Sequence, residues 1–186
     1  MPGDMKSKIA DVLNELLKHK KLDKITVKEL VEACHISRQS FYYHFRDIMD
    51  VVEWYQNQAL KQSIERSLEA PTYKAAIRGF IYEAFQHKEL ILQLMASQRR
   101  PEMEALFVKA VHTYLQELIR GNKLRVFCSP EDVESVISFC SCGLVGMMLT
   151  NLKQKNLDVD VLAEQMCRLL TGEIPIRFAD CKSGLL

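Results

Sequence analysis

The stretch "TVKELVEACHISRQSFYYHF", residues 26 to 45, decides the fold of the first part of the chain. Thr26 has the side chain of a helix N-cap, and Glu29 follows three positions later, which is the spacing of a capping box. Apolar residues then recur at helical spacing, so the sequence predicts a short helix over residues 27 to 34. The tripeptide "HIS" that follows is too short for anything but a tight turn, and Ser37 can cap a second short helix from residue 38 to about residue 45.

The second helix of this pair divides into an apolar and a polar side. Phe41 and Phe45 are four residues apart, so both face the first helix, and Ile36 joins them there. The polar side chains must then point to solvent, which is the division that a DNA recognition helix requires. Arg38 can donate two hydrogen bonds to guanine and Gln39 can pair with adenine, while hydroxyl and imidazole groups suit phosphate oxygens. The predicted DNA-binding residues are Thr26, Ser37, Arg38, Gln39, Ser40, Tyr42, Tyr43 and His44.

The formal net charge of +1 conceals an uneven distribution of charge. Residues 6 to 46 contain nine Lys or Arg against five Asp or Glu, whereas residues 47 to 186 contain sixteen against eighteen. The first quarter is therefore the electropositive part, although a surplus of this size supports nucleic-acid binding only weakly by itself. The sequence has no G-x-S-x-G elbow, glycine-rich phosphate loop or H-E-x-x-H, so we expect neither an enzyme activity nor a cofactor.

Helical spacing recurs along the rest of the chain, and strand alternation does not. Residues 70–72 end one long helix and cap the next, Ser129 and Pro130 begin a helix that reaches about Lys153, and Asp158 caps the last helix. We predict an all-α protein, in which an N-terminal three-helix DNA-binding bundle with a helix-turn-helix is joined to a larger helical domain. The predicted ranges are 1–46 for the DNA-binding domain, 47–70 for a connecting helix, and 71–186 for the effector-binding and dimerisation domain.

Six cysteines occur without the continuous apolar run of a secretory leader, so we expect structural, buried thiols in the reducing cytoplasm. Cys140 and Cys142 would point about 200° apart on a helix and cannot hold a metal from one face, and no metal site is predicted. The uncharged run from Ser135 to Leu152 reaches the lower length limit of a membrane span. Its serines, threonine, asparagine and glycines favour a helix buried in protein, so no membrane partner is expected.

The segment "TVKELVEACHISRQSFYYHFRDIMDVV", residues 26 to 52, resembles the helix-turn-helix of the TetR family of bacterial transcription regulators. The resemblance covers about residues 5 to 55 and implies a repressor that binds a palindromic operator in double-stranded DNA as a homodimer. The helical remainder is similar in general character to shorter Gram-positive regulators, including those of dihydroxyacetone-kinase operons. The residues that carry the motif are Thr26, Ala33, Ile36 and Ser37, Phe41 and Tyr42, and His44 and Phe45.

Two positions depart from the family pattern. His35 stands in the turn where the family usually has glycine, although histidine is among the residues that can adopt a left-handed backbone. Ile48 stands where members of the family often have a lysine that contacts a phosphate. The chain would therefore hold DNA with one fewer charge per subunit, or would use Arg46 instead.

The resemblance also implies that the second domain dimerises and binds an effector. We expect the uncharged helix beginning at Pro130 and the last helix to pack on their symmetry mates, with Gly143 and Gly146 allowing close approach, and a central helix inside one monomer is the alternative. The candidates for the dimer interface are Val136, Cys140, Gly143, Met147, Leu162, Met166 and Leu169. The candidates for an effector pocket, each of which also fits an ordinary core, are Phe80, Phe85, Met95, Phe107, His112, Tyr114 and Phe139.

A second hypothesis for the function is a helical adaptor or co-activator that acts through a protein partner and senses no small molecule. The partner that controls the chain would then be a protein co-regulator rather than a small-molecule effector. Salt-dependent binding to duplex DNA distinguishes a DNA-binding regulator from an adaptor, because each neutralised phosphate steepens the dependence.

Overall fold

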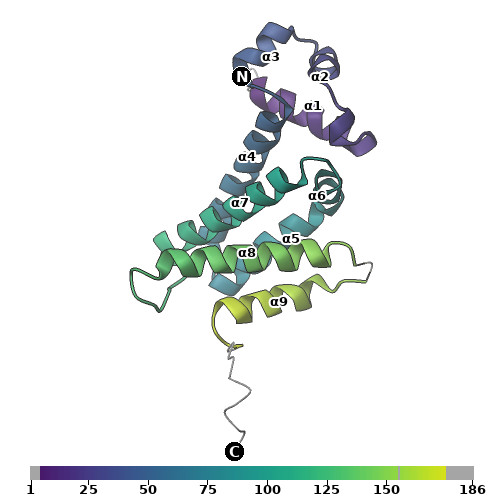
Figure 1. The fold of residues 1–186 in the computed structure, drawn as a ribbon. Helices are drawn as coiled ribbons and strands as arrows, with labels where there is room; N and C mark the ends of the chain where they lie inside the picture. Colours follow the sequence, from purple (N-terminus) through teal and green to yellow (C-terminus); the bar gives the residue numbers. More distant parts are fainter. Residues whose placement is uncertain (1–4, 155, 175–186) are drawn as a thin grey trace, which may run out of the picture.

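The computed structural model describes residues 5–154 and 156–174 of the chain. Within these residues every regular element is a helix, which confirms the predicted all-α fold (Figure 1). In chain order the helices are α1 (Met5–His19), the 3₁₀ helix η1 (Leu22–Lys24), α2 (Val27–Cys34), α3 (Arg38–His44), α4 (Ile48–Glu69), α5 (Tyr73–Gln86), α6 (Lys88–Met95), α7 (Arg100–Arg120), α8 (Val133–Asn151) and α9 (Val159–Leu170).

Helices α1, α2 and α3 form a small head at one end of the molecule (Figure 1). Helix α2 has the predicted bounds, and α3 ends at His44, one residue before the predicted end. Apolar side chains at helical spacing meet in the centre of the head, as the sequence pattern requires. Its buried residues include Ile9, Leu13 and Leu17 of α1, Leu30, Val31 and Cys34 of α2, and Phe41 and Phe45.

Helix α4 runs from the head into the larger helical body (Figure 1). The side chain of Asp47 caps its N-terminus by accepting a hydrogen bond from the third backbone N–H of the helix at 2.9 Å. The helix ends at Glu69, because Pro71 disfavours the helical conformation for the residue that precedes it, Ala70. Thr72 then caps α5 by accepting a hydrogen bond from the Ala75 N–H at 3.1 Å, as predicted.

The body consists of α5 to α9 and the distal half of α4. Helix α7 packs on α8, α5 packs on α9, and α4 contacts both α5 and α7. These contacts enclose a second hydrophobic core, separate from the core of the head. Its buried residues include Ile77, Ile81, Val111, Leu115, Leu118, Ile137, Leu144, Val145, Leu162 and Met166.

The head is docked on the body. Leu94 of α6 and Met103 of α7 are buried in the head's core. Asp23 of η1 accepts a hydrogen bond from the Gln98 N–H, with its two carboxylate oxygens at 3.0 and 3.2 Å. The predicted domain ranges stay a prediction, since the core of the head continues into α6 and α7.

The start of α8 differs from the sequence prediction. The helix begins at Val133 and not at Pro130, because the hydroxyl of Ser129 donates to the Asp132 carboxylate at 2.6 Å and caps no helical N–H. The last helix has the predicted cap: Asp158 accepts from two backbone N–H groups at 2.9 and 3.2 Å. Residues 175–186, which include Cys181, lie outside the described residues.

Among the described residues, α8 is the one helix with the length and hydropathy of a membrane span. Its inner side packs on α7 and carries Ser141, whose buried hydroxyl donates to the Ile137 carbonyl at 2.6 Å. Its other side is largely uncovered in the single chain. A helix that is uncharged after its first turn and covered along one side only is typical of a helix that packs against a second protein chain.

Candidate nucleic-acid interface and effector cavity

Helix α3 presents its polar side to solvent. The rings of Phe41 and Phe45 are 0% and 3% exposed, and they pack against each other and the first core. On the opposite side Tyr42 is 57% exposed and Tyr43 is 85% exposed. Arg38 and Gln39 are also exposed, and Ser40 and His44 are half-buried at the margins. The predicted orientation of this helix is confirmed, and its contact with DNA stays a prediction.

Both capping hydroxyls of the helix-turn-helix are positioned by the hydrogen bonds that they accept. Thr26 accepts from the Glu29 N–H at 3.2 Å, and Ser37 accepts from the Ser40 N–H at 3.0 Å. Each hydroxyl keeps its own proton to donate to a phosphate oxygen. Only half of the predicted capping box forms, because the Glu29 carboxylate pairs with the Lys20 ammonium at 2.7 Å.

The turn between α2 and α3 depends on His35. Its φ of 55° and ψ of 46° lie in the left-handed region, where glycine is the usual residue. The His35 N–H donates to the Glu32 carbonyl at 3.1 Å, and the Ile36 N–H donates to the Val31 carbonyl at 3.0 Å. These bonds end α2 and direct the chain into α3, so histidine fills the turn position here without a change in the motif.

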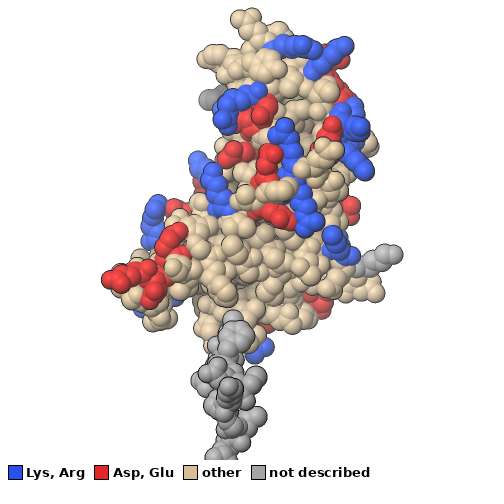
Figure 2. Space-filling view, in the orientation of Figure 1, with Lys and Arg blue, Asp and Glu red and all other residues tan. Residues whose placement is uncertain are grey.

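Arg46 follows α3 but its charge is compensated. Its guanidinium lies 3.3 Å from the Asp50 carboxylate, and its backbone N–H donates to the same carboxylate at 2.9 Å. The hydrogen bond from the Arg46 side chain lowers the pKa of Asp50. Ile48 is half-buried against the head's core, so it offers no contact to a phosphate. Figure 2 shows Lys and Arg side chains on the outer end and flank of the head, with acidic side chains between them.

An apolar cavity of about 170 Å³ lies behind the head, between α1, α4, α5, α6, α7 and α8. Phe80 and Phe107, two of the predicted effector residues, line it. The sequence did not predict the wall contributed by α1, because α1 belongs to the DNA-binding motif and its apolar stripe is explained by the head's own core. The further lining residues include Leu13, Asn14, Leu17, Val52, Tyr55, Gln56, Ser63, Leu90, Leu94, Val145, Met148 and Leu152.

Five predicted effector residues are absent from the lining of this cavity, and their assignment to an effector site stays a prediction. Phe85 packs in the second core and Met95 against the first. Tyr114 is 2% exposed and lies behind Phe80, with ring centroids 4.0 Å apart. Phe139 is 70% exposed on the outer face of α8 and cannot reach the cavity.

The fifth residue, His112, links two helices outside the cavity. Its Nε2 lies 2.8 Å from the Glu134 carboxylate, so the side chain joins α7 to the start of α8.

Burial raises the pKa values of the thiols of Cys140 and Cys167, which keeps both thiols protonated at neutral pH. Within the described part of the chain, no group of three His, Cys, Asp or Glu side chains is placed to hold a metal ion.

The outer face of α8 is uncharged from Ser135 to the end of the helix (Figure 2). A Cβ added to Gly143 or Gly146 would meet nothing within 4 Å, so packing in the single chain does not require glycine at either position. Of the predicted interface residues, Val136, Cys140, Met147 and Leu169 are half-buried. Leu162 and Met166 are 3% and 1% exposed in the chain's own core, which corrects their assignment, because neither side chain can contact a partner. The exposed residues of the α8 face are Ser135, Phe139, Cys142, Gly143, Gly146 and Thr150.

Residues 9–53 match the family model described as bacterial regulatory proteins, tetR family. Solved structures share the fold of nearly the whole chain. The dihydroxyacetone kinase operon activator DhaS has a TM-score of 0.68 at 14% identity, with 91% of this chain and 96% of that chain covered. A TetR transcriptional regulator from Streptococcus agalactiae has a TM-score of 0.67 at 17% identity, with coverage of 89% and 93%. The Thermus thermophilus FadR repressor, solved with lauroyl-CoA, has a TM-score of 0.61 at 18% identity, with coverage of 96% and 100%. No curated protein has a significant sequence match.

Proposed function

We propose that this chain is a transcription regulator of the TetR family, which binds a palindromic DNA operator as a homodimer and responds to an apolar small molecule. The observation that carries the proposal is the orientation of α3, whose two phenylalanine rings are buried while its arginine, glutamine and tyrosines are exposed. A helix anchored in this way can enter the major groove without rearrangement of the head. The match of residues 9–53 to the regulatory family supports the same function.

Binding to DNA is tested with duplex fragments from the region that flanks the gene. We expect specific binding that weakens steeply with salt, because Lys and Arg release counterions from the phosphates. Arg38→Ala should lose about 1–3 kcal/mol of binding energy for the operator and relax its preference at one base position. Unchanged operator selectivity in this variant would reject Arg38 as a reader of bases.

The homodimer is proposed to form through the uncharged face of α8 together with the outer side of α9. One helix-turn-helix reads too few base pairs to be selective, and two copies related by a twofold axis match a palindrome. The open space above Gly143 and Gly146 leaves room for close approach of a partner helix. The exposed Phe139 and Val161 lie on the outer sides of α8 and α9 and would be covered in the dimer.

The dimer is tested by sedimentation of a matched pair of variants. Gly146→Leu places a bulky side chain on the proposed interface, whereas Gly79→Leu adds the same side chain to α5, where a Cβ also meets nothing within 4 Å. Both changes raise helix propensity, so neither should unfold the chain. We expect monomers for Gly146→Leu and dimers for Gly79→Leu and the natural chain. A natural chain that sediments as a monomer at micromolar concentration would remove the dimer from the account.

The apolar cavity is the proposed effector site. It meets the usual description of a ligand site, being concave and lined mainly by aliphatic and aromatic side chains with a few polar groups. The acyl-CoA bound by the T. thermophilus repressor supports a test of ligands with a long apolar chain. We expect such a ligand to lower operator affinity, by favouring an orientation of the heads that does not fit adjacent major grooves.

A further inference from the structure

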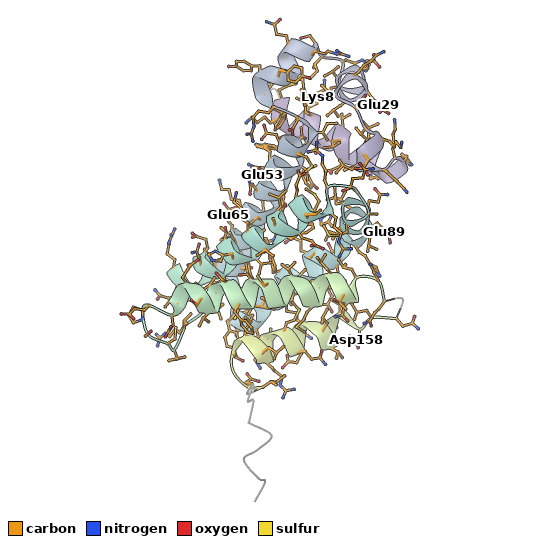
Figure 3. All side chains as sticks on the ribbon, in the orientation of Figure 1. Lys8, Glu29, Glu53, Glu65, Glu89 and Asp158 are labelled. Carbon is orange, nitrogen blue, oxygen red and sulfur yellow. The ribbon has the colours of Figure 1, made fainter. Side chains whose placement is uncertain are left out.

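The effector cavity lies between the head and the body. Leu13, Leu17 and Val52 from the first core form part of its wall, and Val111 and Met148 from the second core form another part. The cavity therefore occupies the seam at which the two cores meet. Helix α4 passes along this seam from the head into the body (Figure 3), and the labelled Glu53 and Glu65 mark its course.

One polar side chain of the head faces this seam without a partner. Asn14 of α1 lines the cavity and is half-buried, and its carboxamide has no hydrogen bond among the described residues. Tyr55 of α4 lines the same cavity, and its hydroxyl likewise has no partner within the described chain. Gln56, beside it, donates to the Leu106 carbonyl at 3.1 Å and thereby holds α4 on α7. A carboxamide carries both donors and an acceptor, so the unpartnered side chain of Asn14 can hydrogen-bond to a polar ligand atom in the cavity.

The charge of the lining restricts what can bind beside Asn14. The polar residues contributed by α1 and the first half of α4 are Asn14, Tyr55 and Gln56, all uncharged. The lining also contains one carboxylate, Glu83 of α5, and one imidazole, His87 directly after α5. Glu83 is already paired with Arg66. A charged ligand group beside α1 would find no counter-ion among these lining residues, and an unpaired charge is unfavourable wherever it is taken out of water.

The cavity is also elongated. Its lining on α4 extends from Val52 to Ser63, which corresponds to roughly 16 Å along a helix that rises about 1.5 Å per residue. Ser63 is 5% exposed, and its hydroxyl has no hydrogen-bond partner within the described residues. Because the cavity is elongated and its lining is mainly aliphatic and aromatic, we expect its occupant to be long and apolar.

We propose that α1 of the DNA-binding head is part of the effector site, and that Asn14 binds the uncharged polar end of an elongated apolar ligand. This inference rests on the proposed function of the cavity. A ligand held by Asn14 on one side and by α4, α7 and α8 on the other contacts head and body at once. Its binding energy then depends directly on the orientation of the head, so ligand and operator affinities are coupled, and the coupling is reciprocal.

The experiment uses decan-1-ol as the probe and the full-length chain. Calorimetry measures the affinity of the natural chain, Asn14→Leu and the control Asn57→Leu, whose asparagine is exposed on α4 and outside the cavity lining. Operator affinity is measured with and without the probe, and its ratio gives the coupling. The single tryptophan, Trp54, packs edge-to-face on Phe45 at 6.0 Å, so its fluorescence reports the packing of α4 on the head.

We expect Asn14→Leu to bind decan-1-ol about 5- to 10-fold more weakly, which is the loss of about one hydrogen bond. The coupling should fall toward one and the ligand-induced change in Trp54 emission should shrink, while Asn57→Leu behaves as the natural chain. Thermal melting verifies folding, and Asn14→Ser, which is smaller and polar, provides a second variant with an intermediate effect.

Two other outcomes are distinguishable. If the natural chain binds the probe but Asn14→Leu retains its affinity and coupling, the ligand lies away from α1, and this inference is overturned while the effector site stands. If the natural chain binds neither decan-1-ol, decanoate nor lauroyl-CoA, the cavity is not an effector site, and both the inference and that part of the proposed function fail.

Discussion

Replacing Phe41 or Tyr43 by alanine separates the two sides of α3. The two aromatic residues are two positions apart on one short helix, yet Phe41 is 0% exposed and Tyr43 is 85% exposed. Truncating a buried phenylalanine to alanine costs about 3–5 kcal/mol, through lost burial and the space left behind. An exposed substitution is usually within about 0.5 kcal/mol. In a chain of this size 1 kcal/mol shifts Tm by about 2–4 °C, so Phe41→Ala should melt about 6–20 °C lower.

The assay combines thermal melting with operator binding for both variants. Tyr43→Ala should melt within about 2 °C of the natural chain. It should nevertheless bind duplex DNA several-fold more weakly, because its hydroxyl is lost from the DNA-facing side. Phe41→Ala should show the opposite pattern at low temperature, with near-natural affinity for the fraction that is folded. A Tyr43→Ala variant that is as destabilised as Phe41→Ala, or a Phe41→Ala variant with unchanged Tm, would refute the orientation of α3.

Three further outcomes are expected. Cys142 of α8 and Cys128 of the α7–α8 loop are both exposed in the single chain. Dimerisation through α8 should therefore protect Cys142 from alkylation while Cys128 reacts. Equal alkylation rates of the two thiols in concentrated protein would contradict a dimer interface on α8. The hydrogen bond from Arg46 lowers the pKa of Asp50 in the folded chain. The ionised Asp50 therefore stabilises the fold at pH values above the pKa of an unfolded aspartate, about 3.9, and this stabilisation is lost as the pH falls through the lower pKa of the folded state. Lowering the pH below about 4 should therefore reduce the unfolding free energy of the natural chain more than that of Asp50→Asn. Identical dependences of stability on pH in the two proteins would contradict this. Asp23→Ala removes the bond from η1 to the body and should cost about 1 kcal/mol in urea denaturation, whereas an unchanged midpoint would show that the head docks without it.

The head could be predicted closely from the sequence because its signals are local. Thr26 and Ser37 are caps that act within three residues, and the spacing of Phe41 and Phe45 fixes which side of α3 is buried. The left-handed turn at His35 could be anticipated only as a departure from the family pattern, since histidine is merely tolerated in that conformation.

The sites of the body are harder to predict from the sequence, because they depend on packing between distant segments. Phe139 and Phe80 look alike in sequence, yet one lies on the outside of α8 and the other lines the cavity. Leu162 was assigned to a dimer interface because its helix is apolar, but periodicity does not distinguish a side chain that faces its own core from one that faces a partner. The contribution of α1 to the cavity depends on how the head docks, which no local pattern records.

The most direct test of the account is a protection experiment on the DNA that flanks the gene, with the natural chain and with Arg38→Ala at two salt concentrations. The account predicts two protected half-sites whose centres are about 34 Å apart or a multiple of that distance, with weaker protection at the higher salt concentration. Arg38→Ala should lose the protection selectively at the half-sites. Protection that is equal for any DNA sequence and for both proteins would contradict the claim that α3 reads an operator.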